Sequence, residues 1–338
     1  MNTRLHLLSD WQHDFPLTAT PFAHIAQSLG LSEADVLAHY RQAQAEGALS
    51  RIGGVFAPGA GGDSLLAAMA VPPEQLDAVA ALVSQQPGVN HNYAREHRIN
   101  LWFVMTGPSG EQVERGLQAL EAQTGHRILR LRMLRPYRID LGFALGQAVA
   151  QQPMRRPPSA RPTAVPAADH ALAALVEQGL PIEARPYATW SRQLGRPEAE
   201  LRQTLAGWLE DGQLQRFGVV VRHHELGYAA NAMTVFDVPD SGVDACGQAL
   251  AAQPGVTLAY RRTRDTDWPY NLYAMVHGQQ RQAVLDVVER MTDAAGLRGF
   301  ARQVLFSTTR YKQTGGRRFA ALPAGHAPQQ ELSHAVCG

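Results

Sequence analysis

The chain contains an internal duplication, and this constrains its fold more than any other feature of the sequence. Residues 21–55 align without gaps on residues 186–220. The segment QPGV also recurs, at 86–89 and at 253–256. Because a repeat of fixed order indicates a copied structural unit, we expect one module that is present twice and fused into a single chain. The aligned identities include Pro21/Pro186, Leu29/Leu194, Gly30/Gly195, Glu33/Glu198, Gly47/Gly212, Leu49/Leu214, Arg51/Arg216 and Gly53/Gly218.

A segment rich in proline and alanine, QQPMRRPPSARPTAVPAA, separates the two copies. Such a composition favours an extended linker over a packed element. The chain of 338 residues is also long enough for about two domains with substantial cores. The expected organisation is a helix-turn-helix domain at 1–60, a sheet domain at 61–148, a linker at 149–168, a second helix-turn-helix domain at 169–222, a second sheet domain at 223–322 and a flexible tail at 323–338.

Each copy shows the same succession of predicted elements. A short helix precedes PFAHIAQSLG, and Ser32 then opens a second helix with acidic residues in its first turn, which is a helix-turn-helix pattern. RIGGVF and QRFGVVV follow as wing strands, and the rest of each copy reads β-α-β-β-α-β. We therefore predict an α+β fold, a tandem repeat of a winged helix-turn-helix plus a ferredoxin-like domain, in which each copy covers the open sheet face of the other.

Composition and charge indicate a globular protein of a reducing compartment. The apolar share is 45% and the net charge is +1, so no overall field attracts nucleic acid or an anionic membrane. Cys246 and Cys337 are too few and too far apart for a disulfide framework. We see no signal peptide and no window of about 18 apolar residues that would span a membrane. The expected location is the cytoplasm, without membrane contact.

The stretch NHNYAREHRINLWF at 90–103 gathers an unusual set of polar side chains. His91, Tyr93, Arg95 and His97 stand at alternate positions just before an apolar run. On an extended strand, a period of two directs alternate side chains from one face. A face with imidazole, phenol and guanidinium groups suits an anionic or metal-bearing ligand better than it suits solvent.

The helix-turn-helix pattern raises the question of DNA binding, because each half resembles the Lrp/AsnC transcription regulators. SEADVLAHYRQAQAEG and PEAELRQTLAGWLEDG each carry one arginine against several acidic residues. A DNA reader needs several Lys or Arg contacts to phosphates, and acidic helices are repelled by them. We therefore expect no DNA partner, and a DNA-binding regulator that senses a small molecule stays as the first alternative.

Three further segments carry a more specific resemblance. They are RFGVVVRHHELGYAANAMTVFDVPD (216–240), AYRRTRDTDWPYNLYAMVHG (259–278) and HNYAREHRINLWFVMTG (91–107). Through nearly all of the chain except the linker and the tail, the sequence resembles the sirohaem decarboxylases of haem d1 synthesis and of the alternative haem pathway. Many members of that family are separate paired proteins, and this chain is similar to a fused pair of both halves.

The resemblance implies a carboxy-lyase that removes CO2 from the C12 and C18 acetates of sirohaem to give 12,18-didecarboxysirohaem. It implies no cofactor beyond the iron of the substrate tetrapyrrole. The residue types suit this substrate, because a carboxylate-rich, largely apolar macrocycle with iron requires apolar walls, arginine forks and a histidine. Self-association, or contact with other proteins of the haem d1 pathway, is the further partner expectation. A tetrapyrrole carrier without catalysis is the second alternative.

The predicted catalytic residues are His91, His223 and Tyr93. His91 stands where the second copy has Leu258, and its two candidate roles are axial ligand to the substrate iron and general acid. By the resemblance, His223 is the second histidine that would handle a proton. Tyr93 matches Tyr260, and each would either hydrogen-bond a carboxylate or pack against the sheet. The predicted substrate-binding residues are Arg95, His97, Tyr260, Arg261, Arg262 and Arg264.

Overall fold

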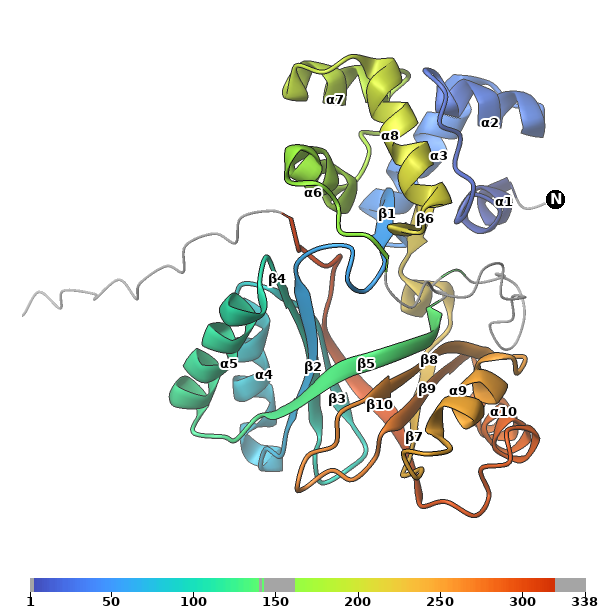
Figure 1. Ribbon diagram of the computed structural model, residues 1–338. Helices are drawn as coiled ribbons and strands as arrows, with labels where there is room; N and C mark the ends of the chain where they lie inside the picture. Colours follow the sequence, from blue (N-terminus) through green and yellow to red (C-terminus); the bar gives the residue numbers. More distant parts are fainter. Residues whose placement is uncertain (1–2, 140–141, 143–161, 320–338) are drawn as a thin grey trace, which may run out of the picture.

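Two layers make up the computed structural model, which describes residues 3–139, 142 and 162–319 (Figure 1). The helix-turn-helix units form the upper layer of that view, and the sheets with their helices form the lower one. Most of the predicted linker at 149–168 and all of the predicted tail at 323–338 lie outside the described residues. Within the described part of the chain, no helix has the length and apolar character needed to cross a membrane.

The two helix-turn-helix units have the same order of elements, and their wings pair with each other. Strand β1 runs antiparallel to β6, with partners from Leu49↔Val221 to Phe56↔Leu214. The Ser32 hydroxyl accepts the N–H of Asp35 and so caps α3, as the sequence predicts. The first unit contains α1 (Thr3–Ser9), α2 (Pro21–Leu29), α3 (Glu33–Ala45) and β1 (Leu49–Phe56); the second contains η2 (Ala167–Asp169), α6 (His170–Gln178), α7 (Pro186–Leu194), α8 (Glu198–Glu210) and β6 (Leu214–Val221).

The arginines of the two acidic helices bind the other helix-turn-helix unit. Arg41 of α3 donates to the carbonyl of Ile182 at 2.8 Å, and Arg202 of α8 donates to the carbonyl of Leu17 at 3.3 Å. These contacts join the two units of the upper layer to each other.

The strands of the two sheet domains form one closed hydrogen-bonded circuit, in the order β10-β3-β4-β2-β5-β8-β9-β7. Each copy has the succession βαββαβ, so the predicted tandem fold is confirmed. The first copy contains β2 (Asp63–Met69), η1 (Pro73–Gln75), α4 (Leu76–Gln85), β3 (Val89–Arg95), β4 (Leu101–Gly107), α5 (Gly110–Thr124) and β5 (Leu129–Ile139). The second contains η3 (His223–Leu226), β7 (Ala230–Phe236), α9 (Val243–Ala251), β8 (Val256–Arg262), β9 (Leu272–Gly278), α10 (Arg281–Ala294) and β10 (Arg302–Gln313).

Two long strands join the copies. Residues 129–132 of β5 pair with β2 of the same copy, and residues 133–139 pair with β8 of the other copy. In the same way, residues 302–306 of β10 pair with β7, and residues 307–313 pair with β3. The sequence predicts that each copy covers the other, and the structure adds that the two sheets are also joined edge to edge.

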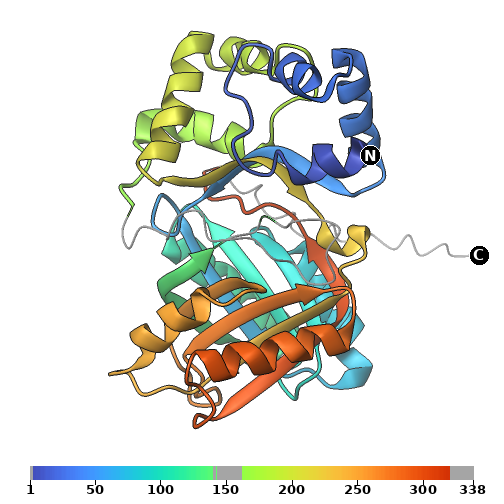
Figure 2. The same ribbon diagram turned by 90° about the vertical axis from the view of Figure 1, so that its right-hand side faces the viewer.

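Helices cover the outer faces of the sheets, and α10 lies across the second sheet in Figure 2. The inner faces of both sheets share a core that includes Trp102, Trp268 and Tyr273. Burial of such large side chains is the main stabilising contribution to this interior. Toward the wing strands β1 and β6 the shared core gives way to a cavity.

Candidate active site

A cavity of about 330 Å³ lies between the inner faces of the two sheets and the wings β1 and β6. Both copies contribute apolar walls, among them Leu66, Trp102, Met233 and Met275. Among the described lining residues Glu177 is the one carboxylate. A cavity with apolar walls and an excess of guanidinium groups suits a large, flat, polyanionic ligand. The arginines that line it are Arg51, Arg95, Arg216, Arg222, Arg262 and Arg318.

Strand β3 directs His91, Tyr93 and Arg95 into this cavity, in agreement with their alternate spacing. An irregularity in the β3–β4 pairing between Val89 and His91 brings Asn90 to the cavity wall as well. The strand therefore presents an imidazole, an amide, a phenol and a guanidinium to one space.

The tautomer of His91 follows from its neighbours. Its Nδ1 lies 2.7 Å from Oδ1 of Asn90. The Asn90 amide nitrogen donates to the Thr106 hydroxyl at 3.2 Å, which leaves the amide oxygen as the acceptor on the side of His91. The Nδ1 atom therefore carries the hydrogen, and Nε2 keeps its lone pair.

Burial, with Arg51 as the second cause, lowers the pKa of His91 to about 4. His91 is half-buried and is one of the residues that line the cavity. At neutral pH the imidazole is therefore uncharged. A neutral imidazole with a free lone pair is a metal ligand, whereas it has no surplus proton to give.

Arg95 and Arg262 occupy equivalent positions of the two copies, and each reaches into the other copy. Arg95 Nη1 donates to the carbonyl of Leu305 at 3.0 Å, and Arg262 Nη1 donates to the carbonyl of Leu131 at 2.8 Å. The Nε atoms of both arginines are buried and have no hydrogen-bond partner among the described residues. Unsatisfied guanidinium donors favour a carboxylate ligand, because leaving them unpaired costs free energy.

Each of these arginines lies over a tyrosine that also lines the cavity. The guanidinium carbon of Arg95 is 5.7 Å from the ring centroid of Tyr93, and that of Arg262 is 4.4 Å from Tyr260. Burial raises the pKa of Tyr93 to about 12, although Arg95 and Arg310 act in the opposite direction. The Tyr93 phenol therefore keeps its hydrogen at neutral pH.

Sequence reasoning missed the arginines that the wings supply. Arg51 of β1 donates to the carbonyl of Gly54 at 3.2 Å, and Arg216 of β6 donates to that of Gln12 at 2.8 Å. These two residues are an aligned pair of the repeat, so the retained arginine was the available signal. A wing of this fold is ordinarily an exposed strand, so the sequence pattern alone predicts no cavity role for these two arginines.

The segment after β10 closes another side of the cavity. Glu177 of α6 accepts the N–H groups of Arg318 and Phe319 at 2.9 and 3.1 Å, and Arg318 donates to the carbonyl of Phe56 at 3.0 Å. Burial raises the pKa of Glu177, while these N–H groups and the nearby Arg318 and Arg51 lower it. The upper and lower layers are thus joined at the cavity.

Three predicted substrate-binding residues do not line the cavity. His97 follows the end of β3, where the chain turns; its Nδ1 accepts the N–H of Ile99 at 3.0 Å. Arg261 alternates with its neighbours on β8, so it points away and pairs with Asp240 at 3.0 Å. Arg264 lies beyond β8 and also pairs with Asp240, at 2.8 Å. These side chains are used in local structure.

Two further histidines lie in the second copy: the predicted catalytic residue His223, and His277, which is not among the predicted site residues. His223 begins η3, and its side chain lies outside the described part of the structure. His277 of β9 is 4% exposed and lines the cavity, with its Nδ1 2.9 Å from the Thr257 hydroxyl. The cavity therefore has a described histidine from each copy.

Two families of known proteins match the chain. Residues 6–49 match the family described as Siroheme decarboxylase NirDL-like HTH domain. Residues 60–138 and 225–312 both match the AsnC-like ligand binding domain. The second match thus falls on each copy of the sheet domain.

Whole-chain similarity extends to named proteins. The Siroheme decarboxylase NirDL subunit of Paracoccus pantotrophus is 41% identical over 316 residues, which cover 92% of this chain and 95% of that protein. The Siroheme decarboxylase NirD subunit of Stutzerimonas stutzeri is 51% identical over 140 residues, 41% of this chain and 92% of that protein. A crystal structure of the siroheme decarboxylase NirDL in co-complex with an iron-uroporphyrin III analogue has a TM-score of 0.64 at 26% identity, over 94% of this chain and 93% of that one.

Proposed function

The chain belongs to the siroheme decarboxylase NirDL family, and from this premise we propose that it removes CO2 from the C12 and C18 acetates of sirohaem. The product would be 12,18-didecarboxysirohaem. Membership of this family makes the protein an enzyme, a carboxy-lyase. The choice of these two acetates is the part that we propose.

The observation that carries this proposal is the excess of arginine in one apolar cavity. Sirohaem is a carboxylate-rich macrocycle, and a guanidinium binds a carboxylate through two parallel hydrogen bonds. Arg95 and Arg262 keep donors that the protein does not satisfy. We propose that these two residues hold carboxylates on opposite sides of the ring, while the wing arginines Arg51 and Arg216 hold carboxylates from above.

His91 is proposed as the axial ligand to the substrate iron. The hydrogen on Nδ1 is fixed by Asn90, and the pKa of about 4 keeps Nε2 available as a ligand. Of the two roles expected from the sequence, these observations support the ligand over the general acid. The structure of the NirDL homologue in co-complex with an iron-uroporphyrin III analogue supports an iron tetrapyrrole as ligand here.

Decarboxylation needs an electron sink and a proton, and we propose no cofactor beyond the iron of the substrate. Loss of CO2 leaves an electron pair on the acetate methylene carbon, which the conjugated macrocycle can delocalise. Apolar walls such as Trp102 and Met233 weaken the solvation of the carboxylate that leaves. Residues of both copies line one cavity, and we therefore propose that both acetates react there. Between the two decarboxylations, the macrocycle would turn and bind again in a second orientation.

Anaerobic incubation of the protein with sirohaem, followed by mass spectrometry of the tetrapyrrole, tests the proposal. We expect successive loss of the mass of one and then two CO2 molecules, with nuclear magnetic resonance locating the new methyl groups at C12 and C18. Absorbance changes without loss of mass would identify a carrier and contradict the proposed function. Methyl groups at other positions would contradict the proposed regiochemistry alone.

A further inference from the structure

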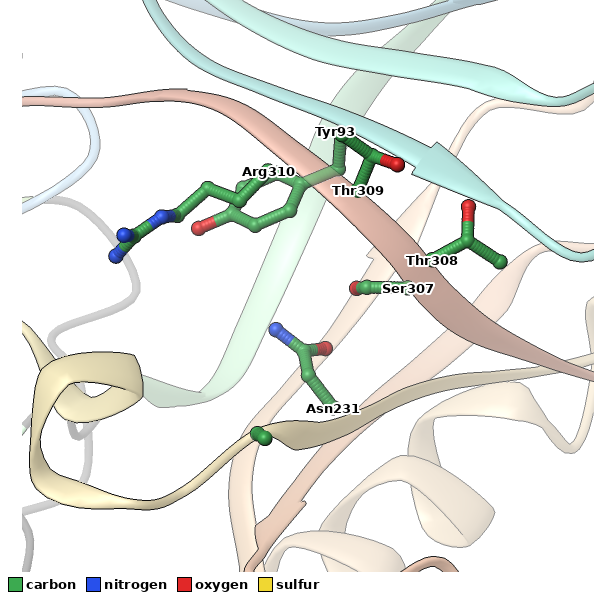
Figure 3. A pocket seen from close by; sticks show the side chains of 7 residues that line it. Tyr93, Asn231, Ser307, Thr308, Thr309 and Arg310 are labelled. Carbon is green, nitrogen blue, oxygen red and sulfur yellow. The ribbon is translucent and has the colours of Figure 1, made fainter.

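A second, smaller pocket of about 40 Å³ adjoins the cavity. Tyr93 and Asn231 line both spaces, so the pocket and the cavity meet at these two residues. The pocket lies where β10 exchanges partners, since Phe306 still pairs with β7 and Ser307 already pairs with β3. Figure 3 shows Ser307 on β10 between Tyr93 of β3 and Asn231 of β7. The exchange of partners along β10 thus opens a small space beside the cavity.

Two buried polar atoms of these lining residues have no hydrogen-bond partner within the described part of the chain: the Ser307 hydroxyl oxygen and the Asn231 amide oxygen. Asn231 is only 6% exposed. The hydroxyl and the amide group can each donate a hydrogen bond as well as accept one. Buried polar groups that the protein leaves unpaired favour a polar ligand, which can displace water from the pocket.

Arg310 adds a positive charge to the wall of the pocket. Its guanidinium forms an ion pair with Glu225 and donates to the Gln313 side chain at 3.3 Å, which fixes its position. A guanidinium beside hydroxyl and amide donors is a suitable site for a carboxylate. A water needs on the order of 10–15 Å³ by the same measure, so the pocket has room for roughly three water-sized groups. One carbon and two oxygens of a carboxylate match that size.

The equivalent places in the other half of the cavity carry different side chains. On β10, Ser307 and Arg310 pair with Arg95 and Tyr93 of β3. On β5, a methionine and a proline stand at these two places, where Met133 and Pro136 pair with β8. The hydroxyl and the guanidinium of the small pocket are thus replaced by a thioether and a proline ring. Only one half of the cavity therefore offers these two groups to a ligand.

We propose that the small pocket binds the carboxylate of one propionate side chain of the macrocycle. The propionate enters beside Tyr93, and its carboxylate displaces water and accepts hydrogen bonds from Ser307, Asn231 and Arg310. This inference rests on the proposed function, and it adds a binding subsite that orients the ring. A group bound at a distance from the reacting carbon restricts the positions that the acetate can take.

A propionate suits this pocket better than the acetate that reacts. Hydrogen bonds and a guanidinium stabilise a carboxylate, so a reacting acetate held there would lose CO2 less readily. The reacting acetate belongs instead near apolar walls such as Trp102 and Met233, which weaken its solvation. A propionate is also longer than an acetate by one methylene, so it reaches further from the edge of the ring.

One such pocket can serve both decarboxylations. In sirohaem the C12 acetate stands next to a propionate at C13, and the C18 acetate stands next to a propionate at C17. Turning the ring over exchanges these two pairs. The neighbouring propionate can therefore enter the same pocket in both orientations, and a second polar pocket in the other half is not needed.

Absorbance titration with two iron porphyrins tests this subsite without any turnover. Iron-uroporphyrin III carries both acetates and propionates, whereas iron-coproporphyrin III carries the propionates and has methyl groups in place of the acetates. Asn231→Asp keeps the shape of the side chain and places a negative charge at the pocket. Because this charge repels a carboxylate, we expect both porphyrins to bind more weakly by the same factor, roughly 10- to 100-fold at low salt. Gln248→Glu adds the same charge at an exposed position of α9 and should leave both affinities unchanged.

Ser307→Val and Ser307→Thr provide a matched pair, because valine and threonine have nearly the same shape and differ by the hydroxyl. We expect Ser307→Val to weaken the binding of both porphyrins by roughly three- to tenfold, and Ser307→Thr to bind them like the parent. This pair decides the question by itself if Asn231→Asp does not fold, which a thermal unfolding curve would reveal.

Parent-like binding of both porphyrins by Asn231→Asp and Ser307→Val would overturn the inference, because the pocket would then hold water only. Weaker binding of iron-uroporphyrin III alone would also overturn it, since the bound group would then be an acetate. Equal losses in the Val and Thr variants would show that the Ser307 hydroxyl does not bind the carboxylate. Absence of CO2 release from sirohaem by the parent protein would instead contradict the proposed function and would leave these affinities unaffected.

Discussion

His91 and Leu258 face one cavity from equivalent positions of β3 and β8. His91 stands opposite Gln313 of β10, and Leu258 stands opposite Ile139 of β5. At this pair of equivalent positions, the first copy therefore presents an imidazole to the cavity and the second copy presents an aliphatic side chain. An iron-bearing ligand between these two positions would meet the His91 imidazole on one side and the Leu258 side chain on the other.

Replacing Asn90 tests the support of the iron ligand. Asn90→Ala removes the acceptor that fixes the Nδ1 hydrogen of His91. Loss of such a supporting partner typically costs 10–100-fold in metal affinity or activity, and we expect that range for sirohaem affinity measured by absorbance titration. His91→Leu should remove the ligand-dependent absorbance bands altogether, whereas His24→Leu on an exposed helical position should leave them unchanged. Parent-like bands in His91→Leu would exclude the ligand role.

The depressed pKa of His91 predicts a dependence of stability on pH. Its pKa is about 4 in the folded protein and ordinarily 6.5, so between these values the unfolded chain binds more protons. The corresponding stability is fully present above pH 6.5 and is lost as the pH falls toward 4, by about 3 kcal/mol in total. His91→Leu lacks this contribution. Denaturant unfolding at pH 7.5 and pH 4 should therefore show a larger loss in the parent than in His91→Leu, and equal losses would contradict the assigned pKa.

Substitution of an arginine that lines the cavity should weaken sirohaem binding much more than substitution of an arginine outside the cavity. Arg95→Met and Arg262→Met each remove a charge-assisted contact worth about 1.5–3 kcal/mol, so we expect roughly 10- to 100-fold weaker sirohaem binding. Lysine at either position should restore only part of this, because an ammonium cannot form the two parallel bonds. Arg264→Met is the comparison, since Arg264 binds Asp237 and Asp240 outside the cavity. Equal losses in all three Met variants would show that the contacts in the structure do not decide binding.

Glu177 should oppose a polyanionic ligand. Glu177→Gln keeps an oxygen that can accept the Arg318 and Phe319 N–H groups but removes the negative charge from the cavity. We expect sirohaem to bind roughly two- to tenfold more tightly at low salt, and the gain should shrink as salt is added. Glu74→Gln, at an exposed position, should show no such gain. Weaker binding in Glu177→Gln would mean that its charge is needed to hold the segment after β10.

The fold could be predicted because each of the two copies carries the same sequence pattern, and each pattern predicts the same elements independently. The aligned pair Gly30 and Gly195 shows this well: both end the first helix of the motif with φ near 65°, which favours glycine in either copy. The sharing of β5 and β10 could not be predicted in this way. A strand that pairs first with its own sheet and then with another has one continuous sequence pattern, so the change of partner leaves no local mark.

The candidate site was predictable where it lies on a single strand. The period of two placed His91, Tyr93 and Arg95 on one face, and it failed at His97 because β3 ends before that residue. Arg51 and Arg318 come from a wing and from the segment after β10, far apart along the chain. These two residues come together at one cavity only through tertiary structure, which cannot be predicted from the pattern of neighbouring residues.

The exchange of partners along β5 and β10 also bears on how the two unlike halves stay together. Two identical halves could close the same circuit as a homodimer, and such an assembly would hold either two imidazoles or two aliphatic groups at the positions of His91 and Leu258. Because the two unlike halves are fused, every chain contains one copy of each. A pairing of two identical halves within one chain is therefore avoided. Each half is then at liberty to specialise, because its complement is always synthesised beside it.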